Sequence, residues 1–202
     1  MAKRTKVAPK YRSIECLIRK IDTPNRKGCE KVLSDNRKLF ETARGSTHNH
    51  QTWEGGYIDH ITDGMNFIVY FYKFMKEFGR RLPFSRSDAL LVFYLHDLEK
   101  PWRIVVDSHG QAKNKAGLTT KDQFKLFREN KLAEYGIKLT PAQQNAFTYI
   151  EGEGKDYSAE RRVMNELGAF CHAVDTWCAR GWFDYPKATG DEWASAGRIR
   201  MT

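Results

Sequence analysis

The chain has 202 residues, of which 41% are hydrophobic and 13% aromatic, and its formal net charge is +9. This size and composition predict one packed domain and exclude a disordered chain, and no apolar run approaches the roughly 20 residues of a membrane span. The basic segment Met1–Lys6 is not followed by the apolar region of a secretory signal, and the four cysteines lack metal-binding or disulfide spacing. We therefore expect a cytoplasmic protein that does not contact membranes.

Most of the excess positive charge lies in residues 1–44, which hold thirteen Lys/Arg and five acidic residues. Such a segment attracts polyanions, for example nucleic acid or nucleotide phosphate. A solvated helical face that keeps the protein soluble has the same composition. The sequence leaves both interpretations open.

Two amphipathic helices are predicted near the N-terminus, over residues 10–21 and 26–43, with Pro24 between them. Together with the first residues they form a predicted basic extension, 1–46. A loop from His48 to Gly56 follows, with two histidines, a tryptophan and a Gly-Gly pair. We expect this loop to line the mouth of a binding pocket, and the glycines to allow close backbone approach.

The helix expected over residues 57–79 has strong 3.6-residue periodicity and contains His60. Ser85 is the expected N-cap of the next helix, with Asp88 as its capping-box partner. That helix is apolar on most faces, which predicts a central, buried position. It leads into Phe93–Trp102, which brings a histidine, a carboxylate and a lysine together within five residues.

Residues 102–110 are expected to form a small hairpin. Thr119 or Thr120 is expected to cap a helix over residues 121–135, and Thr140 a shorter one that ends near Ile150.

Ser158 is the expected cap of the last long helix, which carries Asp175 at the edge of an apolar stripe. Residues 182–202 form a tail expected to pack on the core. The predicted fold is all-α, a bundle of about seven helices with at most a small β-hairpin.

Four polar side chains lie on helices otherwise suited to burial: His60, His96, Asp97 and Asp175. Buried polar groups need partners, and imidazole nitrogen and carboxylate oxygen are both metal ligands. One shared divalent ion would satisfy all four. For the His-Asp pair taken alone, an ordinary helix C-terminus is an equally good explanation.

The order H…HD…D resembles that of the HD-domain metal-dependent phosphohydrolases. Glu54–His60 is similar to the glycine-rich opening of HD-class exoribonucleases, His96–Pro101 resembles the family's HDIGKP segment, and Ala173–Arg180 resembles its closing AD…A-R segment. The resemblance covers residues 47–181 and implies an HD-domain-like helical core there.

The two histidines and two aspartates suit one ion of manganese, iron, cobalt, nickel or zinc, and imidazole makes magnesium less favoured. Such an ion lowers the pKa of water and neutralises charge that develops on a phosphoryl group. Lys100 is then expected to hold a phosphate oxygen, and Glu99 or Asp63 to accept a proton. Further substrate contacts are expected from the side chains of His48, His50, Trp53 and Arg180.

Many two-metal members of this family carry further histidines before the last aspartate, but residues 149–154 contain none. A second ion would need Glu151 or Glu153 as a ligand.

The implied function is hydrolysis of phosphate esters of nucleotides. One alternative is a 3′–5′ exonuclease or cyclic-nucleotide phosphodiesterase, which the glycine-rich opening and the basic first 44 residues favour. Another is a non-catalytic nucleic-acid-binding protein with a vestigial metal site.

Overall fold

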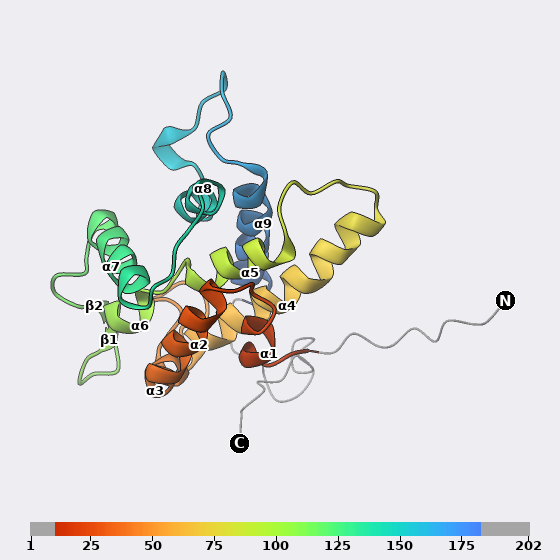
Figure 1. Ribbon diagram of the computed structural model, residues 1–202. Helices are drawn as coiled ribbons and strands as arrows, with labels where there is room; N and C mark the ends of the chain where they lie inside the picture. Colours follow the sequence, from red (N-terminus) through yellow and green to blue (C-terminus); the bar gives the residue numbers. More distant parts are fainter. Residues whose placement is uncertain (1–10, 183–202) are drawn as a thin grey trace.

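The computed structural model describes residues 11–182 (Figure 1). These residues are mostly helical, and they include one two-stranded antiparallel sheet. The expected all-α fold with a small hairpin is therefore confirmed. In this part of the chain no helix is long and apolar enough to cross a membrane.

The N-terminal helices are shorter than expected. They are α1 (Ile14–Ile18), α2 (Asn25–Asp35) and α3 (Arg37–Thr42). The prediction of a single helix over residues 26–43 is wrong, because the helix is interrupted at Asn36. The Asn36 amide donates hydrogen bonds to the Val32 carbonyl and to the Tyr135 hydroxyl, both at 2.9 Å. Side-chain bonds of this kind compete with helical backbone bonding.

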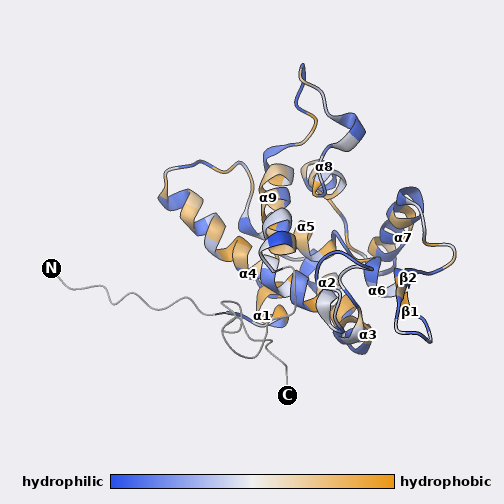
Figure 2. Ribbon diagram, turned by 180° about the vertical axis from the view of Figure 1, so that it is seen from behind, coloured by the Kyte–Doolittle hydropathy of each residue, from blue (hydrophilic) through white to orange (hydrophobic). Residues whose placement is uncertain are grey.

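Three helices form the centre of the molecule: α4 (Gly56–Glu77), α5 (Arg86–Leu95) and α9 (Glu166–Gly181). Each packs against the other two, as expected from the distribution of the polar residues. Gly64 allows α4 to pack closely against Phe93 of α5, since a β-carbon at this position would meet three Phe93 ring atoms at 3.0 Å or less. Figure 2, coloured by hydropathy, shows many orange, hydrophobic residues along these helices.

The expected cap of the last helix, Ser158, is wrong, because the cap of α9 lies seven residues later. Its N-cap is Asn165, whose side-chain oxygen accepts a hydrogen bond from the Gly168 amide at 2.8 Å. The Asn165 side chain also donates to the Ala142 carbonyl at 2.8 Å. This anchors the start of α9 to α8 (Pro141–Tyr149), and residues 158–165 cross the surface without helical structure.

The caps expected at Ser85 and Thr140 are present, and of the pair Thr119 and Thr120 it is Thr120 that caps its helix. All three form capping boxes. Thr120 opens α7 (Lys121–Glu134), and Thr140 opens α8. The short helix α6 (Lys100–Arg103) leads into the hairpin of β1 (Ile104–Val106) and β2 (Ala112–Asn114), in which Val105 pairs with Lys113. A single 3₁₀ turn, η1 (Gly154–Asp156), lies between α8 and α9.

One hydrophobic core runs across the predicted boundary at residue 46. Leu17 of α1 and Phe40 of α3 are fully buried in the same cluster as Ile61 of α4 and Leu90 of α5. The N-terminal helices therefore support α4 and α5, which carry the candidate site.

Candidate metal centre

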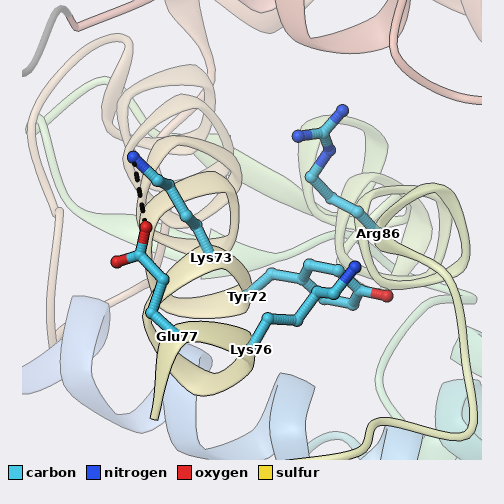
Figure 3. Close-up of a pocket in the computed structure, with 5 residues that line it drawn as sticks. All are labelled: Tyr72, Lys73, Lys76, Glu77 and Arg86. Atoms are coloured by element: carbon cyan, nitrogen blue, oxygen red, sulfur yellow. Dashed lines mark ion pairs between the residues drawn. The ribbon is translucent and has the colours of Figure 1, made fainter. Parts of the chain in front are cut away.

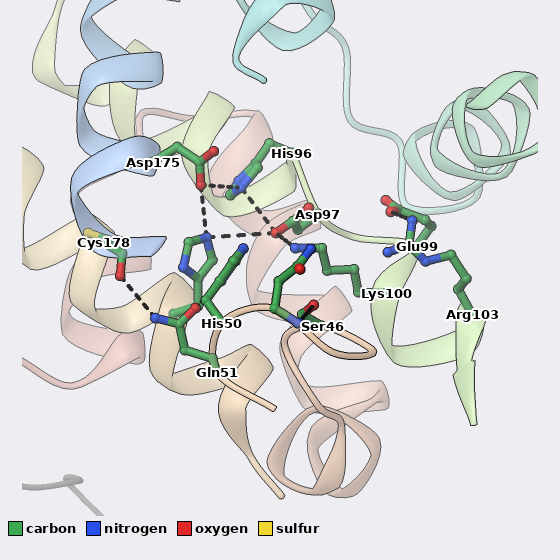
Figure 4. Close-up of polar contacts among 12 residues, drawn as sticks. Ser46, His50, Gln51, His96, Asp97, Glu99, Lys100, Arg103, Asp175 and Cys178 are labelled. Atoms are coloured by element: carbon green, nitrogen blue, oxygen red, sulfur yellow. Dashed lines mark hydrogen bonds and ion pairs between the residues drawn. The ribbon is translucent and has the colours of Figure 1, made fainter. Parts of the chain in front are cut away.

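The central helices bring three potential ligands together from distant parts of the sequence. His60 lies near the start of α4, His96 is the C-terminal cap of α5, and Asp175 lies in α9. One ligand atom from each lies within 4.8 Å of the others, as expected for residues that share an ion. Nε2 of His60 is 3.1 Å from Oδ1 of Asp175, and Nε2 of His96 is 3.4 Å from the same oxygen (Figure 4).

The two Nε2 atoms are buried, and neither has a hydrogen-bond partner among the described residues. They approach carboxylate oxygens, but without the directionality of a hydrogen bond. Buried nitrogens left in this way are rare in folded proteins and require an explanation. A cation between the three residues provides one, because it takes up the lone pairs of both nitrogens and the charge of the carboxylate. The residues present therefore fit a metal ion.

The backbone of α5 orients His96. Its Nδ1 lies 2.7 Å from the Phe93 carbonyl oxygen, so Nδ1 carries the proton and donates it to this bond. The Nε2 lone pair is then directed at the cluster, which is the usual arrangement for a metal-bound histidine. Arg128 of α7 also fixes His96, since its guanidinium donates a hydrogen bond to the His96 backbone carbonyl at 2.5 Å.

Asp97 and Lys100 lie at the edge of the cluster. Oδ2 of Asp97 is 3.2 Å from Nε2 of His96, 3.7 Å from Nε2 of His60 and 2.5 Å from Nζ of Lys100. Burial alone would raise the pKa of Asp97, but the positive charges of His96 and Lys100 outweigh it and hold this pKa well below its usual value. Lys100 therefore reaches the cluster, where it shares Asp97 with the two histidines.

The carboxylates make the cluster a place that favours positive charge. Burial alone would lower the pKa of His96, but Asp97 and Asp175 outweigh this effect and raise the pKa to about 10. Either a proton or a divalent cation can meet this demand, and the two compete for the same nitrogen.

The loop before α4 closes one side of the site. His50 is half-buried, with its ring 5.5 Å from that of His60. Gln51 is fully buried at a φ of +46°, and its side-chain amide donates to the carbonyls of Cys178, at 2.9 Å, and of Trp182. The close approach expected of the glycine pair is confirmed, because a β-carbon on Gly56 would clash with the Gln51 carbonyl.

Gln51 and Arg128 are structural contributors that the sequence analysis missed. Gln51 joins the loop to the end of α9, whereas Arg128 joins α7 to His96. Neither belongs to a local motif. The only available signal for Gln51 was the glycine pair four and five residues later, which indicated tight backbone packing.

The two predicted proton acceptors have different surroundings. Glu99 is turned away from the cluster toward Arg103, at 3.2 Å, and Arg128, at 3.6 Å (Figure 4). Asp63 lies one turn after His60 on α4 and is buried. Burial raises the pKa of Asp63, and a hydrogen bond with the Cys178 thiol offsets part of this effect.

The structure does not bring every predicted substrate contact to the cluster. His48 is exposed and bonded through Nδ1 to the Thr47 hydroxyl at 2.8 Å. The Trp53 indole donates to Oδ2 of Asp59 at 2.7 Å, so the ring is fixed in place. Arg180 is exposed in the last turn of α9.

The two acids considered for a second ion lie beyond the cluster. Oε1 of Glu153 accepts a hydrogen bond from the Met164 amide at 2.9 Å, and Glu151 is exposed.

Comparisons with known proteins leave this geometry as the main guide to function. No protein-family model matches the chain, and no curated protein or solved structure matches it either.

Proposed function

We propose that the protein is a metal-dependent phosphohydrolase that cleaves phosphate esters of nucleotides. The observation that carries this proposal is the convergence of His60, His96 and Asp175 from three helices, with both histidine Nε2 atoms buried and lacking hydrogen bonds. The H…HD…D order of these residues and Asp97, similar to that of HD-domain phosphohydrolases, supports the same conclusion.

His60, His96 and Asp175 would hold the ion, with Asp97 as a fourth ligand at the edge. A divalent ion bound there neutralises charge on a phosphoryl group and lowers the pKa of water. Two neighbouring groups can orient the substrate. Lys100 keeps donors to spare beside Asp97 and can hold a phosphate oxygen. Burial and the charge of Lys100 lower the pKa of His50, so its ring is neutral at pH 7. Its Nδ1 donates to Oε1 of Gln51, which leaves Nε2 to accept a hydrogen bond from a substrate hydroxyl or a water.

Asp63 is a better proton acceptor than Glu99 in this arrangement. Glu99 already balances two arginines, and protonating it would leave Arg103 and Arg128 without their shared partner. Among residues 11–182, Asp63 has no such pairing with an arginine. Burial raises the pKa of both carboxylates, so the freedom of Asp63 from an arginine is what favours it as the proton acceptor.

A hydrolysis screen tests the proposal. The purified chain, loaded with Mn²⁺, is incubated with nucleoside mono- and triphosphates, cyclic nucleotides, short oligonucleotides and a chromogenic phosphodiester. We expect metal-dependent release of product that Asp175→Asn abolishes and a chelator suppresses. The matched control is Asp122→Asn, which changes an exposed carboxylate on α7 and should leave turnover intact.

Two outcomes would contradict the proposal. Turnover that Asp175→Asn leaves unchanged would place the chemistry elsewhere. Absence of turnover on every substrate, combined with nucleic-acid binding that His96→Ala does not affect, would instead support a non-catalytic binding protein.

A further inference from the structure

The C-terminal end of α4, with the start of the loop that follows it, forms a projecting tip of residues 73–82. The tip extends away from the other helices in both views (Figures 1 and 2). Within it Met75 and Leu82 are half-buried, and every other residue is exposed. Gly79, at a φ of +82°, turns the chain, and the amides of Gly79 and Arg80 donate to helical carbonyls at 3.1 and 2.9 Å. The tip is therefore a defined helix end.

Two large aromatic rings lie on the surface of the tip. Phe74 is 56% exposed and Phe78 is 65% exposed, and the two rings stack at 5.8 Å with 17° between their planes. Residues four positions apart lie on the same face of a helix, so both rings point to one side of α4. Rings held in water in this way favour any contact that removes them from it.

Positive charge surrounds the rings on more than one side of the helix. The tip holds four basic residues and one acidic residue, which pairs with Lys73 at 3.5 Å: Lys73, Lys76, Arg80, Arg81 and Glu77. Its net charge is therefore +3. The Arg80 guanidinium lies 5.9 Å from the centre of the Phe78 ring, on the side of the rings. Lys76 lies at a pocket of about 520 Å³ between the end of α4 and the start of α5, which neither ring lines (Figure 3).

This arrangement decides which kind of partner fits the tip. Phe74 and Lys76 are two residues apart, about 200° around the helix axis, so a ligand in a single pocket cannot contact both. A membrane surface that the helix end enters can, because headgroups then surround the helix on every side. Phe74 and Phe78 are about 6 Å apart along the axis. This spacing lies within the depth of roughly 5–10 Å that apolar side chains reach at the boundary between headgroups and acyl chains.

We propose that the tip of α4 binds the surface of an anionic membrane. Phe74 and Phe78 enter the headgroup boundary, whereas Lys76, Arg80 and Arg81 contact lipid phosphates. Anionic lipid is the partner that complements the charge of the tip, since basic residues near such a surface are attracted to it. The expectation of no membrane contact rests on the lack of an apolar run long enough to span the bilayer. A contact at the surface needs no such run.

The test is flotation of the full chain with lipid vesicles. We expect binding to an equimolar mixture of phosphatidylcholine and phosphatidylglycerol that weakens as salt is added, and little binding to phosphatidylcholine alone. Phe74→Ala and Phe78→Ala should each lower the partition coefficient about fivefold or more. Lys76→Gln, Arg80→Gln and Arg81→Gln should each lower it about fivefold.

A second measurement distinguishes insertion of the rings from attraction at a distance. Phe78→Trp keeps a large aromatic ring at the tip and should retain binding. Its additional fluorescence should be quenched by vesicles whose lipids are brominated on the acyl chains. Binding without this quenching would contradict the proposed insertion.

Controls on α7 separate the tip from general effects of charge and hydrophobicity. Lys125→Gln and Leu126→Ala alter an exposed lysine and a side chain that is 59% exposed. Both should bind the mixed vesicles as the wild type does. Because all the substituted side chains are exposed, unchanged melting curves are expected and would show that the variants are folded.

Several results would overturn the inference. One is wild-type affinity for the mixed vesicles in all five neutral variants of the tip. Another is binding to a single-stranded oligonucleotide without binding to vesicles, which would assign the tip to nucleic acid. A third is self-association in sedimentation that Phe78→Ala abolishes, without vesicle binding, which would assign the rings to a second copy of the chain.

The inference does not rest on the proposed function, and the two can fail separately. Variants of the tip should still hydrolyse the small chromogenic phosphodiester, whereas Asp175→Asn should still bind the mixed vesicles. A chain that binds vesicles but hydrolyses no ester would refute only the proposed function. A chain that hydrolyses the small ester but does not bind the vesicles would refute only this inference.

Discussion

Replacing Gly64 with alanine should destabilise the protein, although the same change in an open helix would stabilise it. In a helix interior alanine is favoured over glycine by roughly 0.5–1 kcal/mol. At Gly64, however, the added β-carbon would meet three atoms of the Phe93 ring at 3.0 Å or less. Ordinary carbon contacts lie at about 3.5–4.0 Å.

The size of the effect depends on whether the ring can move. Phe93 is fully buried, so its ring has no solvent-facing space to enter. Inserting a methyl group into such a core costs about 1–3 kcal/mol. Two of the three contacts would be near 2 Å, so the upper part of this range, about 2–3 kcal/mol, applies. Subtracting the gain in helix propensity leaves a net loss of about 1–2.5 kcal/mol. For a chain of this length, that lowers the melting temperature by about 2–10 °C.

The same displacement should reach the candidate metal centre. The Phe93 ring lies 4.7 Å from the ring of His96 and 5.7 Å from that of His60. A shifted ring would rotate the histidines, and loss of such supporting contacts typically weakens metal affinity by about 10–100-fold. Calorimetric unfolding in EDTA measures the stability, and titration with Mn²⁺ measures the affinity.

Two further variants check the reasoning. Thr176→Ala, at an exposed position of α9, also improves helix propensity and should raise the melting temperature slightly. Combining Gly64→Ala with Phe93→Leu should cost less than the sum of the single changes, because the smaller side chain makes room for the methyl group. If Gly64→Ala alone melts at or above the wild-type temperature, the packing argument is refuted.

Three other predictions concern different parts of the molecule. Asp97→Ala should remove both metal and turnover. A metal present at about 100 times its Kd adds about 2.7 kcal/mol to the free energy of unfolding. A chelator should therefore lower the wild-type melting temperature by about 5–11 °C and leave that of the variant unchanged. Full metal occupancy in the variant, measured by elemental analysis, would show that the ion binds elsewhere. His50→Ala should reduce kcat/KM while metal content stays the same, and loss of metal would show instead that the loop supplies a ligand. Burial raises the pKa of Glu15, but the ion pair with Arg37 at 2.5 Å outweighs burial and lowers this pKa. The pair therefore contributes its full stability above the usual pKa of 4.5 and loses it as the pH falls through the lowered pKa. Glu15→Gln should accordingly flatten the acid side of the stability curve, as measured by urea unfolding between about pH 5 and pH 2.

Local signals in the sequence predicted much of the fold. The caps at Ser85, Thr120 and Thr140 each bond to a residue three positions away, so the sequence displays both partners together. The start of α9 was misplaced because Asn165 is fixed by contacts with residues about 20 positions earlier. No local pattern distinguishes Asn165 from Ser158 as a helix cap.

The candidate site likewise has a part that could be predicted from local sequence and a part that could not. The grouping of His60, His96 and Asp175 could be predicted because each is a polar residue on a strongly apolar helix. The surroundings of Trp53 and Glu99 could not, because their partners are set by how the loop and α7 pack. Trp53 is tied to Asp59, and Glu99 is tied to Arg128.

The unbroken length of α4 also fixes the distance between the candidate metal centre and the far end of this helix. His60 and Lys76 lie sixteen residues apart on one straight element, which places them about 24 Å apart along its axis at a rise of about 1.5 Å per residue. This distance is about three times the Debye length of about 8 Å at physiological ionic strength, so the charge of Lys76 is largely screened from the candidate metal centre. The metal affinity of the cluster should therefore be insensitive to charge substitutions at the far end of α4.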